Sequence, residues 1–158
     1  MKSNLISKSK TAEILEQINS QWNVKLSKQK NVRFHYITDN EIIITGTDIT
    51  AIMVGNNILP FLNETTILKK FPNVVVDMGA IQFVCKGANI MRPGIKEFSD
   101  FKKGDIVCVI EESQQKFLAV GIAEMSSDEL KETKKGEVIK NIHYISDNFW
   151  EIGKELSL

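Results

Sequence analysis

The stretch that decides the fold of the second half is VDMGAIQFVCKGANIMRPGI, from Val76 to Ile95. Asp77 is a preferred helix N-cap, and the residues from Gly79 to Lys86 predict a short helix after it. Gly87 follows at the position where a left-handed C-cap is favoured. Asn89 to Arg92 predicts a strand, which a proline–glycine pair ends. The apolar face of the predicted helix consists of Ile81, Val84 and Cys85.

Around this stretch, short β-rich runs alternate with turn signals. A capping box at Ser126–Glu129 predicts a second short helix, which runs to about Lys134 and ends at Gly136. Several short strands with two short helices predict a small mixed β-barrel over residues 73–158. The predicted strands are Val74–Val76, Ile106–Ile110 and Phe117–Ala123, with two more on either side of Asp147-Asn148.

The first half predicts a small α+β domain over residues 1–72. Apolar residues recur at helical spacing between Thr11 and Trp22, which indicates an amphipathic helix. A further helical turn is expected at Thr65–Lys70, and Pro72 stops it. No long linker follows, so Phe71-Pro72-Asn73 is the expected boundary. Three strands of an antiparallel meander are expected at Val32–Tyr36, Ile42–Thr45 and Ile49–Val54.

The composition is that of an ordinary soluble globular protein, with 42% hydrophobic and 25% charged residues. Cys85 and Cys108 stand in apolar surroundings without the paired spacing of a metal or redox motif. We interpret both as small buried hydrophobic side chains in a reducing compartment. No apolar run approaches the ~20 residues of a membrane span, and the polar amino terminus lacks a secretory signal. We therefore expect a cytoplasmic protein without a membrane contact.

Charge is balanced overall but unevenly distributed. The formal net charge is zero, yet residues 1–33 carry seven Lys/Arg and two acidic residues. From Phe71 to the end there are 11 basic and 14 acidic residues. An RNA contact would therefore need a local basic patch together with backbone donors. The basic amino terminus has two interpretations that the sequence leaves open: an electrostatic arm, or a solvated and frayed terminus.

The pattern V-D-x-G-A-x-x-x-V-x-x-G-A-x-I-x-x-P-G-I between Val76 and Ile95 resembles the signature of the PUA domain, which is named for pseudouridine synthases and archaeosine transglycosylases. Gly104–Val107 and Ala119–Ala123 are similar to that family's next strands. Gly87–Gly94 and Asn141–Tyr144 also resemble the malignant T-cell-amplified sequence family of translation factors and its archaeal relatives. Those proteins join an amino-terminal α+β (pre-PUA) domain to a carboxy-terminal PUA domain, in the order expected here.

The resemblance implies that RNA binds in the groove beside the first PUA helix and at the glycine-bearing loops around it. The candidate RNA-binding residues are Gly79, Ala80, Lys86, Gly87, Ala88, Asn89, Arg92 and Lys96. Glycines allow close approach of an RNA backbone, helix-start amides can donate to phosphates, and the cations can neutralise them. Each residue also has a structural alternative: the glycines can serve turns, Asp77 can occupy the amides as a cap, and Lys86 can stabilise a helix C-terminus.

His143, Tyr144 and Trp150 have two interpretations. They can form a stacking platform for a splayed base, as in many readers of single-stranded RNA. Alternatively, Tyr144 and Trp150 close the barrel while His143 is a surface residue.

No catalytic constellation is present, because the two histidines fall in different domains and no nucleophile stands beside a base. We expect a non-enzymatic protein without cofactor or metal that binds structured RNA, either tRNA or ribosomal RNA, in translation. The resemblance implies the small ribosomal subunit and a translation factor as partners, in initiation or recycling. Two alternatives remain open: an accessory subunit that delivers RNA to a modification enzyme, and a protein-interaction module.

Overall fold

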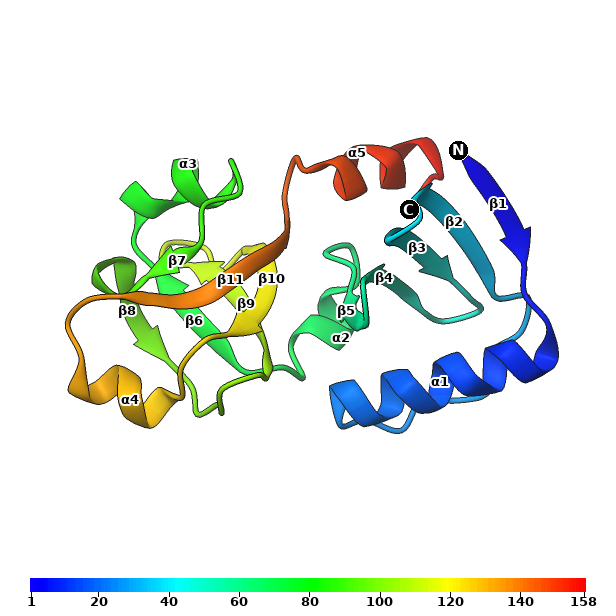
Figure 1. Ribbon diagram of the computed structural model, residues 1–158. Coiled ribbons are helices and arrows are strands. Elements are labelled where there is room, and N and C mark those ends of the chain that lie inside the picture. The colour runs from blue at the N-terminus through cyan, green and yellow to red at the C-terminus, as the bar shows by residue number, and fades with distance from the viewer. The chain divides into compact units, whose positions relative to one another are not determined.

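A five-stranded antiparallel sheet forms the centre of residues 1–61, the first of two units in this computed structural model, which describes residues 1–158 (Figure 1). Its strands lie in chain order, each antiparallel to the next. The expected meander is therefore present, with one additional strand at either edge. The strands are Lys2–Leu5 (β1), Arg33–Thr38 (β2), Glu41–Thr45 (β3), Thr50–Val54 (β4) and Asn57–Pro60 (β5).

One helix, Lys8–Trp22 (α1), packs against this sheet. It begins earlier than expected because the Ser7 hydroxyl accepts a hydrogen bond from the Lys10 amide at 3.1 Å. The Trp22 indole nitrogen donates to the Ile58 carbonyl of β5 at 2.8 Å, which holds the end of the helix against the edge of the sheet. The buried face consists of Ile14, Ile18 and Trp22.

The amino terminus is ordered, so the alternative of a frayed end is wrong. β1 pairs with β2 from Lys2, opposite Tyr36, to Leu5, opposite Arg33. The sequence does not predict this strand because all four of its residues are exposed, which leaves no alternating apolar pattern. β5 is unpredicted for the opposite reason, since Ile58 to Pro60 are buried without alternation.

The second unit, Leu62–Leu158, is a mixed six-stranded sheet in the order β7-β11-β10-β9-β6-β8. Only β6 and β9 run parallel. The edge strands β7 and β8 are joined by the three residues of η2, so the sheet is nearly closed into a barrel. Its elements are Thr65–Leu68 (α2), Asn73–Val76 (β6), Met78–Ala80 (η1, a 3₁₀ turn), Ile81–Val84 (α3), Ile90–Met91 (β7), Arg92–Gly94 (η2), Ile95–Phe98 (β8), Ile106–Glu111 (β9), Phe117–Ala123 (β10), Ser127–Glu132 (α4), Glu137–Tyr144 (β11) and Asn148–Glu155 (α5).

The barrel core is mostly aliphatic. Cys108 is buried, as expected, but its thiol faces the Leu68 carbonyl rather than this core cluster. All six residues of β9 are buried, and burial raises the pKa of the Cys108 thiol to about 12. Cys85 is only partly buried, and burial raises its thiol pKa as well. Both thiols therefore resist deprotonation, which fits a packing role. None of the helices combines the length and apolar character that crossing a bilayer requires.

Two local predictions for this unit differ from the structure, and one strand is unpredicted. The strand expected after Asp147 is wrong, because Asp147 caps helix α5 through a 2.7 Å bond from the Trp150 amide. The strand predicted at Asn89–Arg92 is shortened to Ile90–Met91, since Arg92 already belongs to the η2 turn. β8 is not predicted at all.

The two units divide after Phe61, whereas the sequence places the boundary at Phe71-Pro72-Asn73. Residues 62–72 group with the barrel. The Cys108 amide of β9 donates to the Pro72 carbonyl at 2.9 Å, and the Leu62 amide donates to His143 Nε2 of β11 at 3.2 Å. These bonds join residues far apart in sequence, so local composition does not reveal them.

Candidate nucleic-acid interface

The first turn of the predicted helix is capped by Asp77, as expected. The Asp77 carboxylate accepts from the Ala80 amide at 2.9 Å. Of the helix-start amides of Met78, Gly79 and Ala80, which could donate to an anion, the carboxylate therefore already accepts from that of Ala80. The amides of Met78 and Gly79 make no hydrogen bond within the chain, and both residues are exposed.

The other end of the helix is a Schellman cap centred on Gly87. Gly87 has φ 93°, its amide donates to the Val84 carbonyl, and the Ala88 amide donates to the Phe83 carbonyl, both at 3.0 Å. A Cβ on Gly87 would lie 3.0–3.1 Å from the Tyr144 ring, so glycine is also needed for close packing. The cap and the contact together fix the position of α3 on the barrel.

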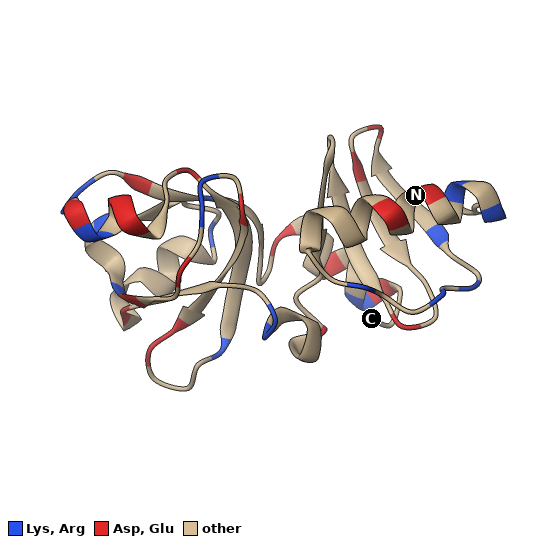
Figure 2. Cartoon of the chain, turned by 90° about the horizontal axis from the view of Figure 1, so that it is seen from below, with Lys and Arg blue, Asp and Glu red and all other residues tan.

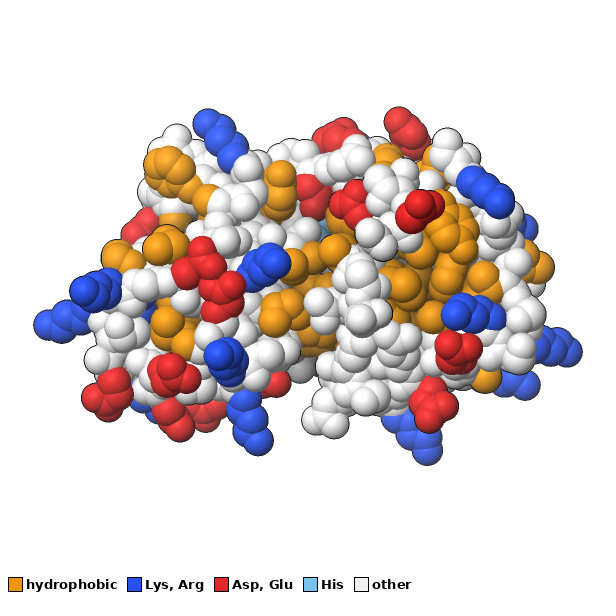
Figure 3. All heavy atoms as spheres, viewed as in Figure 1, with side chains coloured by type: hydrophobic (Ala, Val, Ile, Leu, Met, Phe, Trp, Pro, Cys, Tyr) orange, Lys and Arg blue, Asp and Glu red, His pale blue; other side chains and the backbone are white.

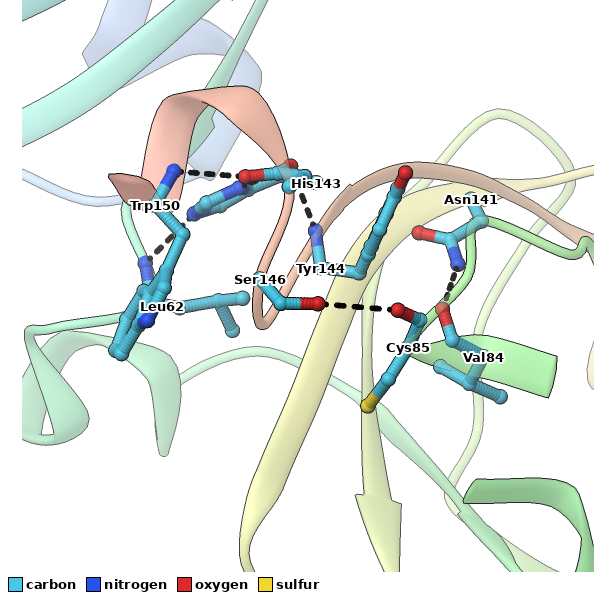
Figure 4. A network of polar contacts seen from close by, with 9 residues as sticks. Leu62, Val84, Cys85, Asn141, His143, Tyr144, Ser146 and Trp150 are labelled. Carbon is cyan, nitrogen blue, oxygen red and sulfur yellow. Dashed lines mark hydrogen bonds and ion pairs between the residues drawn. The ribbon is translucent and has the colours of Figure 1, made fainter. Parts of the chain in front are cut away.

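Side chains of and next to β11 form hydrogen bonds to the end of α3 (Figure 4). The Asn141 side-chain amide donates to the Val84 and Ala88 carbonyls at 3.1 and 3.0 Å, and the Ser146 hydroxyl donates to the Cys85 carbonyl at 3.1 Å. These bonds satisfy carbonyls that the helix end leaves open. The short helix is thus a rigid platform rather than a loose loop.

Two of the candidate RNA-binding residues are directed into the fold. The Asn89 side-chain nitrogen Nδ2 donates to the Glu137 carboxylate at 2.8 Å, and its side-chain oxygen Oδ1 accepts from the Asn141 backbone amide at 2.9 Å. Asn89 therefore joins the segment before β7 to β11. Next to it, a hydrogen bond between Glu124 and Glu137 raises the pKa of Glu124 and lowers that of Glu137.

Arg92 is the second inward-directed candidate. Its Nε donates to the Leu130 and Thr133 carbonyls at 3.0 and 3.1 Å, at the end of α4, and Nη1 donates to the Ile95 carbonyl at 3.2 Å. The guanidinium also lies 5.6 Å from the centre of the Phe98 ring. Arg92 therefore caps α4 and fastens the turn that closes the barrel.

The remaining candidates lie at the surface. Gly79, Ala80, Lys86, Gly87 and Ala88 lie on or directly beside η1 and α3, and Lys96 lies on β8. Lys86 and Lys96 are exposed, and neither forms an ion pair. On the face of the molecule in Figure 3, basic and acidic side chains are interspersed, in line with the expected lack of a broad positive field.

Three large hydrophobic side chains in the same stretch are exposed. Met78 is 50% exposed, Phe83 59% and Met91 49%. Phe83 was not among the candidate RNA-binding residues. Its exposure is predictable from the sequence, because Phe83 falls outside the apolar helix face of Ile81, Val84 and Cys85. We call the exposed set Met78, Gly79, Phe83, Lys86 and Ala88 the α3 surface.

Both interpretations of His143 are wrong, because its side chain is fully buried. Its Nδ1 donates to the Asp147 carboxylate at 2.8 Å while Nε2 accepts from the Leu62 amide, which defines the neutral tautomer (Figure 4). Tyr144 packs against the barrel core, as the second interpretation states, and Trp150 is half-buried on α5. No stacking platform is formed by these residues.

Sequence comparison agrees with the fold. The profile of the PUA domain matches residues 72–145. An uncharacterized protein of Methanocaldococcus jannaschii is 39% identical over 129 residues, which is 79% of this chain and 78% of that protein. Translation machinery-associated protein 20 of Schizosaccharomyces pombe is 43% identical, over 51% of this chain and 48% of its own. Malignant T-cell-amplified sequence 1-A of Xenopus laevis is 37% identical, over 59% and 56%.

The match to the two eukaryotic relatives therefore spans only about half of their length. Among solved structures, a hypothetical protein of Pyrococcus horikoshii OT3 superimposes with a TM-score of 0.80 at 30% identity. That superposition covers 96% of this chain and 99% of the other. A fold similar to that of this chain thus occurs in an archaeal protein of matching length.

Proposed function

We propose that this chain, which belongs to the malignant T-cell-amplified sequence family of PUA-domain proteins and its archaeal relatives, is a non-enzymatic RNA-binding protein of the translation apparatus. The observation that carries the proposal is the α3 surface. It places an exposed aromatic ring, an unpaired lysine and unpaired backbone amides on one rigid element. Base stacking, charge neutralisation and hydrogen bonding are the three contacts that unpaired RNA uses.

Phe83 supplies the stacking contact. Its ring is 59% exposed on a helix whose two ends are both fastened by hydrogen bonds. A ring held in this way loses little conformational freedom when a base stacks on it, and such a contact contributes about 1–3 kcal/mol. Bases are available for stacking only where RNA is unpaired, so the ligand is an unpaired segment of a structured RNA.

Lys86 and Lys96 supply charge, and the amides of Met78 and Gly79 supply donors. Because η1 and α3 together contain only seven residues, the helix dipole adds little, and the lysines carry most of the electrostatic attraction. Arg92 and Asn89 act indirectly, since their hydrogen bonds hold the strands and turn that present this surface.

Among structured RNAs, tRNA fits best through its unpaired acceptor end, with ribosomal RNA of the small subunit as the other source. We place binding to either RNA in initiation or recycling, where a translation-factor partner would act together with this chain. One relative is named translation machinery-associated protein 20, and this name supports the assignment of this chain to translation. A cytoplasmic location follows from the proposed role.

The test is a titration of the full chain with tRNA and with a blunt duplex of matched length, at two salt concentrations. We expect Phe83→Ala to weaken tRNA binding by about 1–3 kcal/mol, roughly 5- to 150-fold. Lys86→Ala should lower the slope of log affinity against log salt concentration by roughly one. Lys102→Ala is the matched control, because Lys102 precedes β9, at the end of the parallel β6–β9 pair opposite α3.

Arg92→Ala separates positioning from contact. It removes three hydrogen bonds within the fold, so we expect a loss of thermal stability together with any loss of affinity. Unchanged tRNA binding in both Phe83→Ala and Lys86→Ala would refute the α3 surface as the RNA site. If Phe83→Ala instead released a protein from the purified chain, the exposed apolar residues would mark a protein interface.

A further inference from the structure

A second candidate site lies in the first unit, for which the sequence predicts no single RNA-binding residue. A hollow of about 720 Å³ opens between the end of β1, the first half of α1 and the loop at residues 28–31. Its apolar walls include Ile6, Ala12 and Leu15. Pockets of this volume are typical of sites for small ligands.

The charge of this hollow is of one sign. Lys8, Lys28 and Lys30 line it, and none of its ten lining residues is acidic. All three lysines are exposed, and none forms an ion pair. Figure 2 shows basic positions at the amino end of α1 and along the adjacent loop. Three of the seven basic residues at positions 1–33 therefore line one cavity.

The hollow is also preorganised. The Thr47 hydroxyl accepts from the Lys30 amide at 3.0 Å and donates to the Lys30 carbonyl at 3.2 Å. The side-chain oxygen Oε1 of the buried Gln29 accepts from the Asp48 amide at 2.9 Å. These bonds fix the loop that carries Lys28 and Lys30. The lysines therefore approach a ligand from a rigid wall, which lowers the entropic cost of binding.

Backbone donors lie at one edge of the hollow. The Ser7 cap uses the Lys10 amide, and the Ser7 carbonyl accepts from the Thr11 amide. The amides of Lys8 and Ser9 in the first turn make no hydrogen bond within the chain. α1 has 15 residues, so its positive dipole end adds to the attraction of the lysines for an anion.

We propose that this hollow binds one nucleotide of single-stranded RNA. Its phosphate would lie among Lys8, Lys28 and Lys30, and its ribose and base would lie against the aliphatic wall. No aromatic ring lines the hollow, so the contact is independent of base identity. The site adds a second RNA contact to the proposed function and does not depend on the α3 surface.

The test is two-dimensional NMR of the full ¹⁵N-labelled chain with a five-nucleotide oligouridine, with adenosine monophosphate and with an oligoglutamate peptide as separate probes. We expect the oligonucleotide to shift the amides of Lys8, Ser9 and residues 28–31. Lys28→Ala combined with Lys30→Ala should weaken the oligonucleotide affinity measured from these shifts by about tenfold. It should also lower the slope of log affinity against log salt concentration by roughly two. Lys25→Ala is the matched control, because Lys25 is exposed nearby but does not line the hollow.

Ala12→Trp fills the hollow without removing charge, and we expect it to abolish the same shifts. Ala12 is exposed on α1, so the variant should fold. The proposal is overturned if neither set of variants changes oligonucleotide binding, or if only the mononucleotide or only the peptide shifts these amides. Phe83→Ala combined with Lys86→Ala should leave the shifts at residues 8, 9 and 28–31 intact, which separates failure here from failure of the α3 surface.

Discussion

Gly87 shows how one residue serves conformation and packing at the same time. Its φ of 93° lies in the region that glycine adopts without strain, and the Tyr144 ring occupies the space where a Cβ would project. Gly104 has nearly the same φ, 91°, but no atom within 4 Å of its absent Cβ. The two glycines therefore separate the backbone cost from the steric cost.

We expect Gly87→Ala to destabilise the chain by about 2–4 kcal/mol, because backbone strain and overpacking add. Gly104→Ala should cost about 1 kcal/mol from strain alone. Urea denaturation followed by circular dichroism measures both. Equal losses in the two variants would mean that Tyr144 moves away freely and that the ring does not hold α3.

Residue roles were predictable from the sequence where the partner is near in the chain. The Asp77 cap and the Gly87 cap are local motifs, and both are confirmed. Asn89 and Arg92 form hydrogen bonds to partners far along the chain, at Glu137 and at the end of α4, which the local sequence does not reveal. Their assignment to RNA stays a prediction. Lone surface cations such as Lys86 stay predictions, since exposure alone does not identify a ligand.

Among the elements, α5 depends on a single carboxylate. Asp147 accepts from His143 Nδ1 at 2.8 Å, from the Tyr144 amide at 2.9 Å and from the Trp150 amide at 2.7 Å. The first two bonds belong to β11 and the third starts α5. Asp147 therefore couples the last strand of the barrel to the last helix.

We expect Asp147→Ala to lower the free energy of unfolding by about 2–4 kcal/mol, since it leaves a buried histidine without its acceptor. Asp77→Ala is the control at an equivalent cap with a single side-chain bond, and it should cost about 0.5–2 kcal/mol. Chemical denaturation ranks the two variants. A smaller loss for Asp147→Ala than for Asp77→Ala would contradict the coupling.

Elements were predictable where periodicity or capping is strong, as for α1 and the capping box of α4. Three kinds of element were missed. β1 is wholly exposed, β5 is buried without alternation, and α5 follows an Asp-Asn pair that equally suits a turn. For β1 and β5 the pairing with neighbouring strands decides the structure, whereas α5 starts at the local Asp147 cap.

At the scale of the whole molecule, the position of the domain boundary determines which fragments are stable on their own. Residues 62–72 belong to the barrel unit by their contacts, although composition places them with the first half. Leu62 and Leu68 are 4% and 0% exposed. Besides the bonds of Leu62 and Pro72 to the barrel, the Cys108 thiol lies 3.7 Å from the Leu68 carbonyl.

We therefore expect the fragment 62–158 to be more stable than the fragment 73–158. The shorter fragment lacks Leu62 and Leu68, and the burial of each leucine contributes about 1.5–3 kcal/mol. Loss of the Leu62 amide also leaves His143 Nε2 without that donor. Thermal unfolding of both fragments, with His143→Phe introduced into each, measures the difference. The substitution should reduce the gap between the fragments, because it removes the group that residue 62 contacts. Equal stability of the two unsubstituted fragments would place the boundary at Pro72 and assign residues 62–72 to the first domain.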